Sequence, residues 1–306
     1  GLRYPNRRPW LLLILVAVVT VIVVQRTRRS KPTDDEAEAR SATTAEVEQA
    51  VDRPTEEAVV PEQDFADISD ALSTARRLET AGELVKARQI YQGLLDRELD
   101  PRTLAGLRDR LGALNTQLVM EPYPMPEKVE YVVQRGDSVE RIARRFGTTI
   151  ELIQVSNRLA NPNVIKAGDV LRVLNGDFRI EISKSEKELV LELNGKFFKR
   201  YMIGTGKYDK TPEGTFVLAE KEKEPVWWPK GREVPFGHPD NILGTRWMGI
   251  RATGDTPPVR GYGIHGTWDD ASIGKAESAG CVRMHNSDVE ELFALVPSGT
   301  PVTIAK

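Results

Sequence analysis

Cysteine is nearly missing from this sequence, since 306 residues include a single one, Cys281. One cysteine excludes an intramolecular disulfide and a cysteine-rich zinc site. Histidine is also scarce, with 3 residues in the chain. We therefore expect no metal centre and no bound cofactor, and any thiol chemistry must use that one sulfur.

An excess of charge of either sign is missing too, because 43 Lys and Arg face 45 Asp and Glu. The net charge of −2 gives no general attraction to nucleic acid, so we expect no such partner. The balance hides one local extreme. Residues 33–64 carry 11 acids against 2 arginines and contain no aromatic residue. This composition predicts a disordered acidic linker.

Long apolar runs are absent except for residues 10–24, which contain no charge. Three arginines precede this run and four basic residues follow it. Fifteen residues fall short of the roughly 20 that usually span a bilayer, but flanking basic side chains can snorkel. No small-x-small cleavage site follows. We predict a signal anchor with one transmembrane helix over residues 1–32, and extracytoplasmic domains after it.

Helical periodicity begins near residue 65 and continues to residue 120. Gly82 breaks the pattern once, and Asp100-Pro101 ends the second helix and starts a third. The first two helices weakly resemble one tetratricopeptide-type (TPR-like) hairpin. A spacer or packing role is favoured, and a groove for a protein partner is the alternative. Alternating prolines in residues 121–129 then predict an extended linker.

Residues 130–174 have the pattern strand, helix, helix, strand. Their fixed spacings resemble a LysM domain, from Tyr131-x-Val133 and Gly136-Asp137-Ser138 to Asn157, Gly168 and Leu171. The resemblance implies binding to peptidoglycan and other glycans that contain N-acetylglucosamine. It also places glycan contacts in two loops. The residues expected there are Gly136, Asp137, Ser138, Asn161 and Ile165.

Beyond Asn175 the apolar period becomes two, which predicts a mainly β domain over residues 178–306. Asn194-Gly195 is typical of a type I′ hairpin turn. One helix is expected after the capping box Ser287–Glu290. We expect a β-sandwich-like domain with one short helix near its C-terminal end.

Two residues of this domain suggest nucleophilic chemistry: His265, and Cys281 sixteen residues later. A free thiol is mostly protonated at neutral pH, and a neighbouring imidazole can take its proton. Small residues before Cys281 let backbone amides approach an oxyanion, and Arg283 can steady the thiolate or hold a substrate carboxylate. Taken alone, the pair fits core residues equally well.

The wider pattern resembles the YkuD family of L,D-transpeptidases. The matching motifs are Thr211-Pro212-x-Gly214-x-Phe216, Leu243–Trp247, His265-Gly266-Thr267 and Ser278-x-Gly280-Cys281-Val282-Arg283-Met284. The resemblance implies that Cys281 is the nucleophile and His265 its acid and base, with Gly266 orienting the ring. It implies oxyanion amides at Gly280 and Cys281. Ala279 departs from the histidine that many members carry, which puts rate and substrate preference in doubt.

The implied reaction joins two peptidoglycan stem peptides. Cys281 attacks the carbonyl of the third stem residue, releases D-alanine, and passes the acyl group to an amine of a second stem. Water as the acceptor would make the enzyme an L,D-carboxypeptidase. A non-catalytic, membrane-tethered peptidoglycan-binding scaffold is the other alternative. A serine enzyme at Ser272–Lys275 is disfavoured, because no Lys-Thr-Gly element accompanies that motif.

Overall fold

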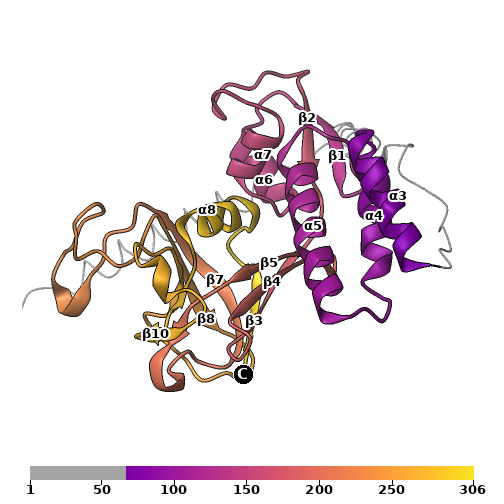
Figure 1. Ribbon diagram of the computed structural model, residues 1–306. Coiled ribbons are helices and arrows are strands. Elements are labelled where there is room, and N and C mark those ends of the chain that lie inside the picture. Colours follow the sequence, from indigo (N-terminus) through magenta and orange to yellow (C-terminus); the bar gives the residue numbers. More distant parts are fainter. Residues whose placement is uncertain (1–66) are drawn as a thin grey trace, which may run out of the picture. The chain divides into compact units, whose positions relative to one another are not determined.

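The computed structural model describes residues 67–306, so the predicted signal anchor and the predicted acidic linker lie outside the described residues. Within this range the chain forms three helices, then a small α/β module, then a large sheet with one α-helix (Figure 1). No helix in residues 67–306 is long and apolar enough to cross a bilayer.

The three N-terminal helices are α3 (Ile68–Thr80), α4 (Leu84–Leu94) and α5 (Pro101–Met120). Their predicted breaks are confirmed. Gly82 has a φ of +79°, which glycine adopts without the penalty of a Cβ. The Asp100 carboxylate accepts hydrogen bonds from the amides of Arg102 and Thr103, which caps α5, and Pro101 takes the first helical position.

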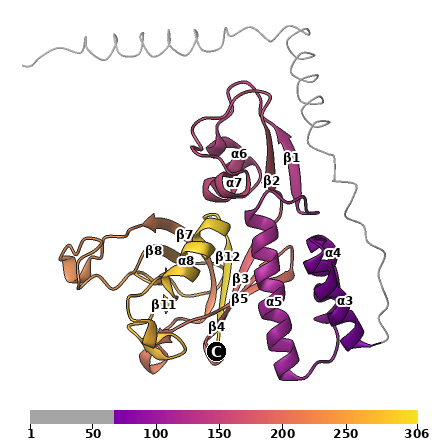
Figure 2. The same cartoon turned by 45° about the horizontal axis from the view of Figure 1, so that its top comes forward.

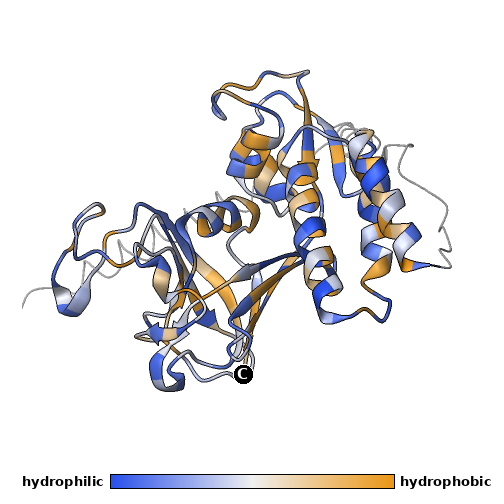
Figure 3. Ribbon diagram, viewed as in Figure 1, coloured by the Kyte–Doolittle hydropathy of each residue, from blue (hydrophilic) through white to orange (hydrophobic). Residues whose placement is uncertain are grey.

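Helix α5 lies against strand β5 of the large sheet (Figure 2). Hydrophobic and hydrophilic residues alternate along α5 (Figure 3). Its buried leucines, Leu107, Leu111, Leu114 and Leu118, belong to the same core as the sheet. Buried Asn115 donates from Nδ2 to the carbonyl oxygen of Phe198, at 2.8 Å. The helices therefore share their core with the β domain.

The small module contains β1 (Lys128–Val132), α6 (Val139–Arg145), α7 (Ile150–Ser156) and β2 (Val170–Leu174). This order confirms the strand, helix, helix, strand prediction, and the two strands pair antiparallel. The module has a core of its own, formed by Tyr131, Val133, Val139, Ile142, Ala143, Phe146, Ile153, Leu171 and Val173. Its two ends meet, because the Asn175 amide donates to the Glu127 carbonyl at 2.8 Å.

The β domain is built on one eight-stranded sheet with the order β11-β9-β8-β7-β12-β3-β4-β5. Its strands are β3 (Phe178–Ser183), β4 (Glu188–Leu193), β5 (Lys196–Met202), β7 (Gly214–Lys223), β8 (Arg246–Ala252), β9 (Gly263–His265), β11 (Val282–Arg283) and β12 (Pro301–Ala305). A separate pair joins β6 (Thr205–Gly206) to β10 (Ala276–Ser278). The predicted hairpin turn is present, since Asn194 and Gly195 both have positive φ.

The sandwich-like arrangement expected from the sequence is wrong in one respect. Strand β12 pairs with β3 on one side and with β7 on the other. It therefore joins the N-terminal hairpins to the later strands in one continuous sheet, where a sandwich would have two. The C-terminal strand makes this connection, which short alternating segments cannot reveal.

Helix α8 (Asn286–Leu295) follows β11 directly. The predicted cap at Ser287 is wrong, because the N-cap is His285, two residues earlier, and it makes no side-chain capping bond. At the other end, the half-buried Lys221 ammonium donates to the carbonyls of Phe293 and Val296, at 2.7 and 2.6 Å. A cation at a helix C-terminus satisfies carbonyls that have no partner in the helix.

Candidate active site

Two neighbouring parallel strands, β9 and β11, bring the chain segments that hold the predicted catalytic residues side by side. In the register of β9 and β11, Ile264 lies opposite Val282 and His265 lies opposite Arg283. Ile264 and Val282 are fully buried in the core. Because side chains alternate along a strand, His265 and Arg283 face the other way. Cys281 stands two residues before Arg283, in a bend just ahead of β11, and its Sγ donates to the Gly261 carbonyl at 3.6 Å.

The His265 ring is held in one orientation. Its exposed fraction is 2%, and Nδ1 lies 2.6 Å from the carbonyl oxygen of Gly266. A carbonyl only accepts, so Nδ1 carries the proton and Nε2 is free to take one. The Trp247 ring stacks on the imidazole at a centroid distance of 5.8 Å. The Gly266 carbonyl is the group that the resemblance assigned to orienting the ring.

Burial keeps the thiol and the imidazole uncharged. It lowers the pKa of His265 to about 4, and the nearby positive charge of Arg283 acts in the same direction. Burial also raises the pKa of Cys281, although the Gly263 backbone and Arg283 oppose this. At neutral pH the resting thiol and the resting imidazole are therefore both uncharged.

The segment before Cys281 is tightly folded. Gly280 has a φ of +144°, and a Cβ there would lie 2.6 Å from the Tyr262 ring, so only glycine fits. Its amide donates to Ser278 Oγ at 3.0 Å, and that hydroxyl donates to the Cys281 carbonyl at 2.6 Å. The Gly280 amide, expected from the resemblance to face an oxyanion, therefore already has an acceptor in this structure.

The loop that follows His265 is held by Asn286, a residue that sequence reasoning did not single out. Its Nδ2 donates to the Thr267 carbonyl at 2.9 Å, and its Oδ1 accepts from the Thr245 amide at 3.1 Å. Asn286 thus connects the start of α8 to segments on both sides of the histidine. Its position at a helix start gives no signal for this role.

In the small module, the predicted glycan-binding residues shape two loops. Asp137 accepts from Tyr131 Oη at 2.7 Å, and Ser138 Oγ caps α6 through the Arg141 amide at 3.2 Å. Asn161 Oδ1 accepts from the Asn163 amide at 2.9 Å. Gly136 is exposed with a φ of +90°, whereas Ile165 packs partly against the core of the module. These contacts fix the loops and leave their outer surface open to solvent.

Two family models match this chain. The L,D-transpeptidase catalytic domain, YkuD, matches residues 177–304, and the LysM domain matches residues 131–174. The putative L,D-transpeptidase YqjB of Bacillus subtilis is 42% identical over 132 residues, which cover 43% of this chain and 73% of that protein. The putative L,D-transpeptidase YkuD of the same species is 37% identical over 186 residues, with 57% and 97% covered.

Among solved structures, the catalytic domain of an Enterococcus faecium L,D-transpeptidase is 27% identical. The match covers 42% of this chain and 97% of that one, with a TM-score of 0.33, so the assignment rests on the sequence matches. This chain belongs to the YkuD family of L,D-transpeptidases and carries a LysM domain ahead of its catalytic domain. It is a cysteine-dependent L,D-transpeptidase.

Proposed function

We propose that this enzyme crosslinks peptidoglycan stem peptides, with Cys281 as its nucleophile and His265 as its acid and base. The observation that carries the proposal is the pairing of β9 with β11, which puts His265 opposite Arg283, two residues after Cys281. Family membership supports the reaction class, and the half-buried thiol supports a site that a substrate can reach.

The first step is acyl transfer to sulfur. Cys281 Sγ forms a bond to the third-residue carbonyl carbon of a tetrapeptide stem while Nε2 of His265 takes the thiol proton. The tetrahedral intermediate then breaks its C–N bond, and His265 returns the proton to the departing D-alanine amine. A thioester and a neutral imidazole remain.

The second step reverses these roles. An amine of a second stem attacks the thioester carbonyl, and His265 takes the proton that the amine loses. The C–S bond breaks, and the proton returns to sulfur as the thiol re-forms. Water in place of the amine would give L,D-carboxypeptidase activity at the same site. The low pKa of His265 keeps its base form dominant at neutral pH.

The other site residues would stabilise the negative charge that develops on the thiolate and on the oxyanion. Arg283 lies close enough to influence both catalytic groups and keeps its buried Nε without a hydrogen-bond partner within residues 67–306. It can stabilise the thiolate as it forms, or hold a substrate carboxylate. The oxyanion needs backbone N–H donors near Cys281. The Cys281 amide is our first candidate, since the Gly280 amide donates to Ser278.

The remaining regions fit a wall enzyme. The LysM module, with Gly136, Asp137, Ser138, Asn161 and Ile165 in its two loops, would bind glycans containing N-acetylglucosamine. Residues 1–32 would anchor the chain in the membrane, residues 33–64 would span to the wall, and residues 130–174 and 178–306 would act on the extracytoplasmic side. The helices of residues 65–120 would serve as a spacer or packing region, and binding of a protein partner is the alternative.

The test uses the full chain and its Cys281→Ala and His265→Gln variants. Purified tetrapeptide stems are incubated with each protein, and the products are identified by mass spectrometry. We expect crosslinked dimers plus free D-alanine from wild type, and no dimer from Cys281→Ala. Retained crosslinking by that variant would refute the mechanism. Free D-alanine without dimers would indicate the carboxypeptidase, and no product from a folded wild type would favour the binding scaffold.

A further inference from the structure

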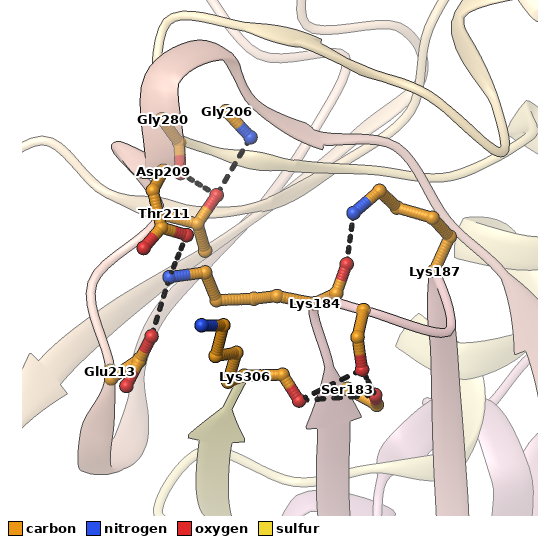
Figure 4. Close-up of polar contacts among 10 residues, drawn as sticks. Ser183, Lys184, Lys187, Gly206, Asp209, Thr211, Glu213, Gly280 and Lys306 are labelled. Atoms are coloured by element: carbon orange, nitrogen blue, oxygen red, sulfur yellow. Dashed lines mark hydrogen bonds and ion pairs between the residues drawn. The ribbon is translucent and has the colours of Figure 1, made fainter.

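Buried Thr211 touches the catalytic segment although it lies 70 residues before the nucleophile. Its hydroxyl accepts a hydrogen bond from the Gly206 amide at 2.8 Å and donates one to the Gly280 carbonyl at 2.9 Å (Figure 4). The hydroxyl therefore accepts one hydrogen bond and donates another, and it links two backbone segments. The sequence analysis placed Thr211 in a motif that resembles the family and gave it no role.

The Gly280 carbonyl and the Cys281 amide belong to the same peptide group. In a trans peptide, C=O and N–H point in opposite directions. A hydrogen bond that holds the carbonyl toward Thr211 therefore aims the Cys281 N–H away from it. We propose that Thr211 is a positioning residue that orients this N–H as the oxyanion donor for acyl transfer. The inference rests on the proposed role of Cys281.

The support under Thr211 is rigid. A Cβ on Gly206 would lie 2.8 Å from the Gly280 Cα, so the two backbones are in direct contact. Strand β6, which carries Gly206, also pairs with β10, and β10 leads into the catalytic segment. Thr211 therefore bridges two segments that have little freedom to separate.

Lys184 clamps the turn that carries Thr211. Its buried ammonium lies 2.5 Å from Asp209 Oδ1 and 2.8 Å from Glu213 Oε1, one on each side of Thr211 (Figure 4). Burial disfavours the charge of Lys184, but these two carboxylates outweigh it and raise its pKa. Tyr208 and Asp209 both have positive φ, which is a tight conformation for non-glycine residues. The charge pair offsets that strain and holds the turn in place.

Two reactions of the same sulfur separate an oxyanion role from a structural one. Acylation of Cys281 by a carbapenem passes through a tetrahedral oxyanion, and it should depend on the aimed N–H. Alkylation by iodoacetamide is a direct displacement that forms no oxyanion. A residue that only orients the oxyanion donor will change the first rate and leave the second unchanged.

The experiment compares Thr211→Val, which keeps the shape and removes the hydroxyl, with Thr211→Ser, which keeps the hydroxyl. Thr300→Val is the matched control, because Thr300 is also buried and donates to a backbone carbonyl, that of Pro297, at 2.8 Å. We expect Thr211→Val to slow acylation by about 10- to 100-fold, in line with the cost of a misplaced catalytic group. Alkylation should stay at the wild-type rate. Thr211→Ser and Thr300→Val should acylate near the wild-type rate.

Three outcomes would overturn the proposal. They are an unchanged acylation rate in Thr211→Val, an equal fall of acylation and alkylation, and a Thr211→Ser variant as slow as the valine variant. Thermal unfolding of each protein checks the fold, and the serine variant decides the question if the valine variant does not fold. If wild type forms no acyl adduct at Cys281, the proposed function fails instead, so the two failures are distinguishable.

Discussion

The LysM module and the helices α3 to α5 both precede the catalytic sheet, but they relate to it differently. The module buries its own set of side chains in a separate core, and its ends meet at Glu127 and Asn175. The helices have no separate core, because their buried leucines belong to that of the sheet. The module is thus an insertion with local cohesion, whereas the helices are part of the catalytic unit.

The module meets the catalytic domain through both polar and apolar contacts. Glu151 of α7 pairs with Lys223 of β7 at 2.7 Å, and Thr149 donates to the Ala294 carbonyl of α8. Leu152 is the buried apolar residue of α7 that joins the core of the sheet. Exposed ion pairs contribute little, so this junction is expected to stabilise either side only slightly. We therefore expect that the module can be deleted without unfolding the catalytic domain, whereas the helices cannot.

The largest effect is expected from deleting each region in turn. Removal of residues 130–174 should reduce retention on insoluble peptidoglycan by about 100-fold, because a second attachment point is lost. Turnover of soluble stem peptides should remain near wild type, since the cut ends already meet. Removal of residues 67–120 should leave an insoluble or unfolded catalytic domain. Retention is measured by sedimentation with purified peptidoglycan, and turnover is measured with soluble stem peptides. An equal loss of turnover in the two deletions would contradict the proposed difference between the module and the helices.

Truncation of one core side chain in each region tests the same difference between the helices and the module. Leu111→Ala in α5 and Ile142→Ala in α6 each remove buried methyl groups, at a cost of about 3 kcal/mol. For Leu111→Ala, faster hydrogen exchange should extend to the strands of the catalytic sheet and lower activity. For Ile142→Ala, it should stay within residues 130–174. Exchange monitored by mass spectrometry locates the loss, and a catalytic sheet unaffected by Leu111→Ala would show that the helices fold separately.

Acid should weaken the catalytic unit through His265, whereas the LysM module contains no histidine. The folded pKa of His265 is about 4, below the ordinary value near 6.5 of an unfolded chain. Between these values the unfolded state binds the extra proton, so this group lowers stability as pH falls. By pH 4 the loss is about 3 kcal/mol. Denaturant unfolding of wild type and His265→Gln across this range measures it, and parallel pH curves would contradict the assignment.

Local patterns predicted much of the secondary structure, and motif order predicted the catalytic pair. Gly82, Asp100-Pro101 and Asn194-Gly195 marked breaks that the structure has, because backbone preferences act within a few residues. The cap at Ser287 failed, since the chain leaving β11 already turns at His285. The continuous sheet was missed because β12 finds its partners more than 80 residues away.

The sequence by itself determined the elements and the chemistry available to them: one thiol, an imidazole sixteen residues before it, and small residues that allow a tight approach. Only the tertiary structure decided which groups meet. Sheet pairing set His265 beside the Cys281 segment, and burial set the charge states of both groups. Thr211 reached the Cys281 segment from a distant turn, and Asn286 reached the loop after His265 from the start of α8. Local propensity acts between neighbours in the chain, whereas pKa values and hydrogen bonds depend on neighbours in space.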